Sequence, residues 1–218
     1  RYKRFFADVQ LDNKLVTAHC PNTGSMLGLL NEGNKVYLSE SDNEKRKLKY
    51  TLEVIKLKSK HVGVNTHRTN RIVEKALNEK VFTFIKNIKE IRREVKYGEN
   101  SKIDFLVTTS NEQVYIEVKN VTLARNKSVA EFPDAVTARG TKHLIELGKL
   151  KKKGIRAIML YIVQRDDCES FQLAKDIDPT YAKNLDNAMK RGVEVFCYDC
   201  KFSDKDILIN RKIKFIND

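Results

Sequence analysis

The sequence predicts an α/β protein in two parts: a small N-terminal β-barrel, followed by an α/β domain whose central mixed sheet is flanked by helices. Short strand-like runs separated by turn residues fill roughly the first 65 positions. Beyond them, helical and strand periodicity alternate. The continuous apolar run at 155–164 is typical of a strand buried on both faces. We therefore expect two domains, at residues 1–66 and 67–218.

The expected barrel strands are residues 3–9, 15–19, 35–38, 50–58 and 61–64. Turn-forming residues separate them, including PNTG at 21–24 and NEGN at 31–34. Five short strands at this spacing indicate a small barrel, of which the OB-fold is the nucleic-acid-binding form.

The second domain should begin with a helix over 70–87, because apolar residues recur there at helical spacing and Asn70 can cap it. Strands are expected at 91–97, 101–107 and 114–120, before a second helix at 135–152. After the buried strand, Asp178 and Pro179 predict the start of a third helix, which Gly192 ends. Strands at 193–202 and 207–215 complete the domain.

The chain of 218 residues is strongly basic: 42 Lys and Arg against 29 Asp and Glu give a formal charge of +13. Such an excess favours a polyanionic partner. We expect nucleic acid rather than a membrane, because the chain has no Trp and no apolar run long enough to span a bilayer. Four scattered cysteines do not suggest a disulfide scaffold, so a reducing compartment, the cytoplasm, is expected. The sequence does not indicate the oligomeric state.

Basic residues are concentrated in a few segments that could bind the nucleic-acid backbone. The alternative is that these side chains are ordinary solvated surface. Together with His143, which shares a helical turn with two of them, the candidate residues are Lys3, Arg4, Lys45, Arg46, Lys47, Arg71, Arg139 and Lys142.

Two neighbouring strands carry charged side chains where a sheet usually has apolar ones. Asp104 lies on the first strand, and Glu117 and Lys119 lie two apart on the second, so the last two share a face. A polar turn at 108–113 makes the strands antiparallel neighbours, so all three groups can converge. Two carboxylates can hold a hard cation such as Mg²⁺ (or Mn²⁺), and the lysine can orient the attacking water. The alternative is a solvated ion pair, since Glu-x-Lys arises by chance in so charged a chain.

A further carboxylate could come from the preceding helix. Glu74 and Glu79 are the candidates there, and Glu94 is another on the first strand of the meander. For each of these alone, a solvated surface position is the simpler interpretation.

At these residues the chain resembles the bacterial sugar fermentation stimulation protein (SfsA) family. The resemblance covers nearly the whole chain and rests on RYKRF at 1–5, HCPNTGSM at 19–26, SDNEKRK at 41–47, VNT at 64–66, EVKYG at 94–98, SKIDF at 101–105, YIEVK at 115–119 and FPDAVTARG at 132–140.

The resemblance implies an OB-fold joined to a PD-(D/E)XK nuclease-like domain, with non-sequence-specific DNA binding and a regulatory role in sugar (maltose) metabolism. It places Asp104 and Glu117 at the metal-binding positions, with Lys119 completing Glu-x-Lys and Glu74, or alternatively Glu79, as the helical glutamate. The Val118 carbonyl is a further expected metal ligand.

The predicted function is therefore a DNA-binding protein with a Mg²⁺-dependent site that cleaves phosphodiesters. One alternative is a non-catalytic DNA-binding regulator that uses a nuclease fold as a scaffold. An RNA-binding module is another, because the barrel suits either nucleic acid.

Overall fold

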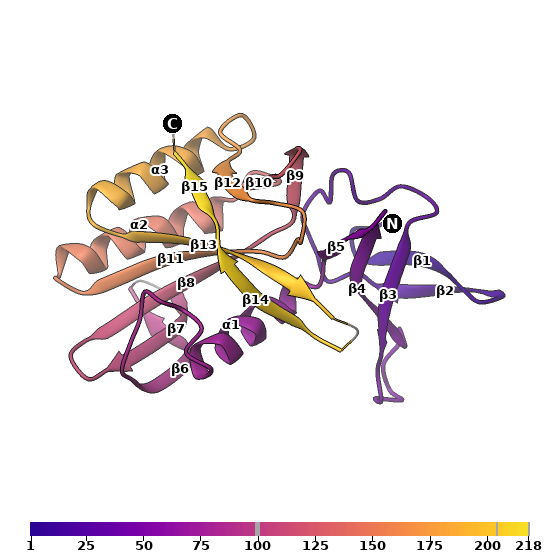
Figure 1. The fold of residues 1–218 in the computed structure, drawn as a ribbon, viewed down its shortest axis with the longest axis horizontal. Coiled ribbons are helices and arrows are strands. Elements are labelled where there is room, and N and C mark those ends of the chain that lie inside the picture. Colours follow the sequence, from indigo (N-terminus) through magenta and orange to yellow (C-terminus); the bar gives the residue numbers. More distant parts are fainter. Residues whose placement is uncertain (99–100, 204, 218) are drawn as a thin grey trace.

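The structure is a computed structural model that describes residues 1–98, 101–203 and 205–217 (Figure 1). The first strands form a five-stranded sheet at one end of the molecule, in which β1 (Phe6–Leu11), β2 (Lys14–His19), β4 (Tyr50–Leu57) and β3 (Lys35–Glu40) follow one another and β5 (Lys60–Gly63) also pairs with β4. Its interior is a small apolar cluster of its own. The expected barrel strands are all present, with ends shifted by up to three residues.

The second part is built on a six-stranded mixed sheet. Its order is β14 (Ile207–Lys212), β13 (Glu194–Phe202), β11 (Arg156–Val163), β8 (Gln113–Val121), β7 (Ser101–Thr109) and β6 (Ile88–Tyr97). Strands β8, β11 and β13 are parallel, whereas β6, β7 and β8 form an antiparallel meander. The buried strand predicted at 155–164 is therefore β11, in the middle of the sheet.

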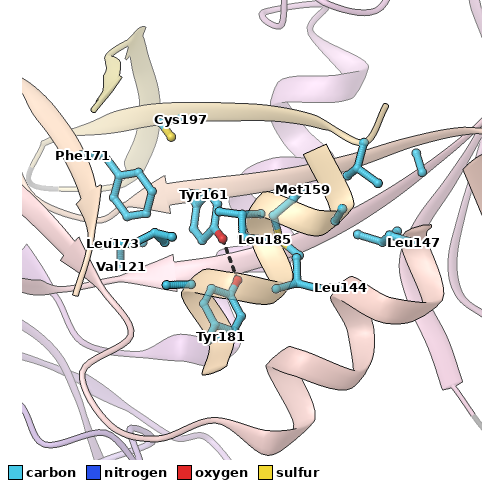
Figure 2. Packing of buried hydrophobic residues seen from close by; sticks show 14 of the residues in the cluster. Val121, Leu144, Leu147, Met159, Tyr161, Phe171, Leu173, Tyr181, Leu185 and Cys197 are labelled. Atoms are coloured by element: carbon cyan, nitrogen blue, oxygen red, sulfur yellow. Dashed lines mark hydrogen bonds between the residues drawn. The ribbon is translucent and has the colours of Figure 1, made fainter. Parts of the chain in front are cut away.

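Helices cover both faces of this sheet. Figure 1 shows α2 (Ala138–Lys152) and α3 (Pro179–Lys190) above it and α1 (Thr69–Asn78) below it. Each face has its own apolar core. In the upper core the Tyr161 and Tyr181 hydroxyls are 2.6 Å apart, which joins β11 to α3 (Figure 2). The mixed α/β architecture is the one the sequence predicts.

The helix predicted over 70–87 is shorter than expected. It ends at Asn78, and Lys80 then takes a left-handed backbone angle (φ 57°) that a helix cannot contain. The apolar residues that extended the helical pattern, Phe82 and Ile85, are buried in the same lower core from an irregular segment. Asn70 is not the N-cap, because the helix already includes Thr69.

A separate sheet of four short strands was not predicted. It consists of β15 (Lys214–Ile216), β12 (Ser170–Leu173), β10 (Val129–Phe132) and β9 (Leu123–Asn126). Each of these strands has only three or four residues, too few for a periodic pattern to identify. A 3-10 turn, η1 (Thr66–Arg68), links the barrel to α1. In the part of the chain that is described, no helix is both long and apolar enough to cross a membrane.

Candidate active site

The site begins where β7 and β8 separate. The two strands are in register from Thr108 and Gln113 to Phe105 and Ile116. At the next residue the Asp104 carboxylate lies between the strands, and its Oδ2 accepts a hydrogen bond from the Val118 amide at 2.8 Å. A side chain thus replaces a ladder contact, which opens the sheet at the position of the charged residues.

The second oxygen of Asp104 is held by a residue of α1. Its Oδ1 accepts a hydrogen bond from the Asn70 side-chain amide of α1 at 2.8 Å. Burial and the nearby negative charge of Glu117 raise the pKa of Asp104 to about 6, although both hydrogen bonds act in the opposite direction. Asp104 therefore carries its charge in surroundings that disfavour it.

Glu117 is the most deeply buried member of the group, with 2% of its surface exposed. Its Oε1 accepts a hydrogen bond from the Lys119 ammonium at 2.7 Å and also contacts Nδ1 of His143 on α2. Burial acts to raise the pKa of Glu117, but Lys119 and His143 outweigh it, so the pKa lies below the ordinary value. Glu117 is therefore ionised at neutral pH.

The other oxygen of Glu117, Oε2, is buried and has no hydrogen-bond partner among the described residues. Burying a carboxylate oxygen without a partner costs free energy unless a bound cation or a hydrogen-bond donor contacts that oxygen. Asp104 and Glu117 are oxygen ligands of the kind that Mg²⁺ and Ca²⁺ prefer. No group of three or more His, Cys, Asp or Glu side chains arranged for a metal occurs within the described ranges. A cation would therefore rest on two carboxylates, supplemented by backbone carbonyls and water.

These residues line one open cleft of about 470 Å³. Of the predicted site residues, the cleft brings together Asp104, Glu117, Val118, Lys119 and Arg139. Three more basic side chains border it: His67 of η1, Arg93 of β6 and His143, the last of which was also a candidate from the sequence. Glu94 also lies at its edge. The lining thus combines three carboxylates with basic side chains, of which Arg93, Lys119 and Arg139 could contact a phosphodiester.

The structure does not bring Glu74 into this group. Its carboxylate accepts a hydrogen bond from Arg93 at 3.1 Å at the surface. Asn70, one helical turn earlier, is the α1 residue that reaches Asp104. Glu79 lies exposed just after α1. Glu74 can therefore influence the cleft through Arg93 rather than by direct contact.

The predicted nucleic-acid-binding residues fall into two sets. Arg139 lines the cleft, whereas Arg71 and Lys142 are exposed on their helices outside it. The barrel set is also on the surface: Lys3, Arg4, Lys45 and Lys47 are exposed, and Arg46 is half-buried. Arg4 borders a neighbouring pocket of about 310 Å³ that shares Thr66, Asn120 and Thr137 with the cleft.

Sequence reasoning missed the roles of His143 and Asn70. His143 was assigned to a basic face that grips phosphate, but its side chain is buried against Glu117. The available signal was a single histidine next to Leu144, both on the inward face of a helix, because a buried polar side chain needs a partner. Asn70 offered no comparable signal, since a cap is the common role of Asn near a helix start.

Comparisons with known proteins agree over the whole chain. A family model described as "Sugar fermentation stimulation protein RE domain" matches residues 67–206, and one described as "SfsA N-terminal OB domain" matches residues 1–64. A sugar fermentation stimulation protein homolog of Pelagibacter ubique is 51% identical over 100% of this chain and 94% of its own length. The homolog of Maricaulis maris is 47% identical over 98% of this chain and 92% of its own.

A solved structure shows the same fold. It is that of Pyrococcus furiosus SfsA in complex with Ca²⁺, with a TM-score of 0.91 and 24% identity, covering 99% of this chain and 92% of that one. At this identity the likeness concerns the fold alone.

Proposed function

The chain belongs to the sugar fermentation stimulation protein (SfsA) family, and we propose that it binds DNA and cleaves its phosphodiester bonds with the help of a divalent cation. The observation that carries the proposal is the pairing of Asp104 with Glu117 in one cleft, where Glu117 Oε2 has no partner among the described residues.

In this proposal Asp104 and Glu117 hold Mg²⁺ or Mn²⁺, with the Val118 carbonyl as a further ligand. When bound, such a cation activates water and neutralises phosphate charge. The Ca²⁺ in the Pyrococcus furiosus relative supports the choice of a hard cation with oxygen ligands. Relief of the repulsion between the two carboxylates also favours cation binding.

The protein's own groups do the remaining work. Lys119, held 2.7 Å from Glu117, orients the attacking water and offsets charge on the phosphate as it becomes pentacovalent. His143 keeps the Glu117 carboxylate in place from α2. Arg139 and Arg93 contact the backbone phosphates, and Glu74 positions Arg93.

The barrel residues 1–66 would hold more of the backbone, while residues 67–218 carry the chemistry. Phosphate contacts contain no sequence information, so binding should be non-specific and steeply dependent on salt. The formal charge of +13 agrees with this mode. A regulatory role in sugar (maltose) metabolism would then depend on how DNA binding is used in the cell.

The test is a cleavage assay on plasmid and single-stranded DNA with Mg²⁺ or Mn²⁺, with binding to DNA and RNA of equal length measured on the same preparations. Wild type is compared with Glu117→Ala and Lys119→Ala, and Glu90→Gln serves as the control because Glu90 is exposed on β6 outside the cleft.

We expect metal-dependent cutting that both site variants lose while they still bind DNA and the control cuts normally. Binding without cutting, with every metal and every DNA form, would contradict the enzyme and leave a DNA-binding regulator on a nuclease scaffold. Tighter binding to RNA than to DNA would instead favour the RNA-binding module.

A further inference from the structure

One arginine and two histidines gather where the barrel meets the cleft. His19 of β2 pairs in register with Thr51 of β4. The Arg46 guanidinium, from the loop before β4, donates to the Thr51 hydroxyl at 2.7 Å. Thr51 therefore holds Arg46 beside His19.

The third side chain, His67, comes from η1. The backbone amide of His67 donates to the Asn65 side chain at 3.0 Å, and Asn65 in turn donates to Glu53 at 2.9 Å. Glu53 lies two residues after Thr51 on β4, and its carboxylate accepts a hydrogen bond from Ser39, the residue that pairs with Thr51. Thr51 and Glu53 of one strand thus hold Arg46 directly and, through Asn65, the backbone of His67, which also lines the catalytic cleft.

Their mutual proximity has an electrostatic effect. Burial, then the charge of Arg46 and then that of His67, lower the pKa of His19. The carboxylate of Glu53, on the same strand as Thr51, is already bound by Arg68 at 2.9 Å and by Ser39 at 2.6 Å. Across the described ranges, no carboxylate pairs with the side chains of His19, Arg46 or His67. Arg46 therefore has a positive charge without a counter-charge, beside two imidazoles that no described carboxylate binds.

We propose that His19, Arg46 and His67 form a binding site for a nucleic-acid backbone phosphate that flanks the one in the catalytic cleft. The inference rests on the proposed function, because it assumes that the Asp104–Glu117 cleft holds a nucleic-acid strand. The guanidinium offers charge and N–H donors to phosphate oxygens, and the two imidazoles offer further N–H donors. Only His67 of the three lines the cleft, which puts this phosphate at the barrel side of it. The substrate strand then runs from the catalytic cleft across η1 onto the barrel.

The first test measures binding of a short oligothymidylate in EDTA, so that no cleavage takes place. Arg46→Gln and His67→Gln are compared with Lys14→Gln, which removes a charge from an exposed position on the same barrel outside the group. We expect each of the two variants to weaken binding about tenfold and the control to change little. Arg46→Gln should also lower the slope of log affinity against log salt by about 0.7, the value for one phosphate contact on a single strand. Equal effects in all three variants would overturn the proposal.

The second test needs no variant and so does not depend on folding. The imidazole NMR signals of the four histidines are followed while inorganic phosphate, and then the oligothymidylate, is added to the metal-free protein. His61 is the internal control, because Asp166 already holds its ring at 3.0 Å. The signals of His19 and His67 should move with both probes while that of His61 stays. Movement of His61 alone, or of no histidine, would overturn the proposal.

These results separate this site from the catalytic one. If the Arg46 and His67 variants lose binding and the wild type never cuts DNA, the phosphate site is supported and the nuclease function is contradicted. If both variants bind normally and the wild type cuts DNA in a metal-dependent way, the nuclease function is supported and the phosphate site is contradicted.

Discussion

The Asp104 carboxylate accepts a hydrogen bond from the backbone amide of Val118, 2.8 Å across the opening between β7 and β8. Because Val118 directly follows Glu117, this bond ties the positions of the two carboxylates to each other. The Asp104 side chain takes the place of a backbone ladder contact here, and Asp104, Glu117 and Lys119 line one cleft. Such local departures from regular structure are common at functional sites.

Replacing Asp104 should stabilise the metal-free protein. Its pKa rises from 3.8 to about 6 on folding, so the folded state holds this proton more tightly than the unfolded state. The ionised Asp104 carboxylate therefore lowers the free energy of unfolding. This destabilisation is absent below pH 4, grows as the pH rises toward 6 and is fully present above pH 6. Asp104→Asn removes this destabilisation, and urea unfolding in EDTA at pH 7.5 should show a gain on the order of 2 kcal/mol.

The pH dependence is the control for this prediction. The gain from Asp104→Asn should shrink as the unfolding experiments are repeated at pH 6 and 5. A variant less stable than wild type at pH 7.5, or a gain independent of pH, would show that Asp104 is not a strained charge.

His143 should act on cleavage through Glu117. His143→Ala frees the carboxylate that it contacts and should lower the cleavage rate roughly 10- to 100-fold, as is usual when a group that orients a metal ligand is lost. His143→Gln can still donate a hydrogen bond and should recover part of the rate. Rates are measured over a range of Mn²⁺ concentrations.

Two outcomes distinguish positioning from a general structural effect. If His143 positions a metal ligand, more Mn²⁺ should be needed for half-maximal rate. Ile145→Ala, an exposed change on the same helix, should leave both rate and metal requirement unchanged. A His143→Ala protein with normal cleavage would contradict the role.

The hydroxyl pair formed by Tyr161 and Tyr181 should behave as a unit (Figure 2). Changing either tyrosine to Phe leaves the other hydroxyl buried without its partner and should cost about 1–2 kcal/mol of unfolding free energy. The double variant should cost less than the sum of the two single ones, because it leaves no such hydroxyl behind. Additive costs in urea unfolding would mean that the hydroxyls do not depend on each other.

The parts of the fold that the sequence predicted are those with long periodic patterns. The run in β11 and the cap at Asp178 suffice to place the central strand and α3, since Asp178 accepts a bond from the Tyr181 amide. The end of α1 could not be predicted, because Phe82 and Ile85 continue the helical spacing while packing from an irregular segment. The short strands β9, β10 and β12 carry no periodicity of their own.

The site shows the same division. Strand alternation was enough to put Glu117 and Lys119 on one face, and the structure brings them into one cleft with Asp104. The contacts of Asn70 and His143 join elements far apart in the chain, so they depend on tertiary packing that local pattern does not contain. Glu74 illustrates the converse, since a plausible helical position turns out to face Arg93.

Binding of a divalent cation by Asp104 and Glu117 is central to the proposed function. It is tested most directly by titrating Mn²⁺ or Mg²⁺ into metal-free wild type, Asp104→Asn, Glu117→Gln and the Glu90→Gln control by calorimetry. We expect a metal site in wild type and in the control, and an affinity for the metal at least about tenfold lower in each of the two carboxylate variants. Equal affinity in all four proteins, or no binding to wild type, would contradict it.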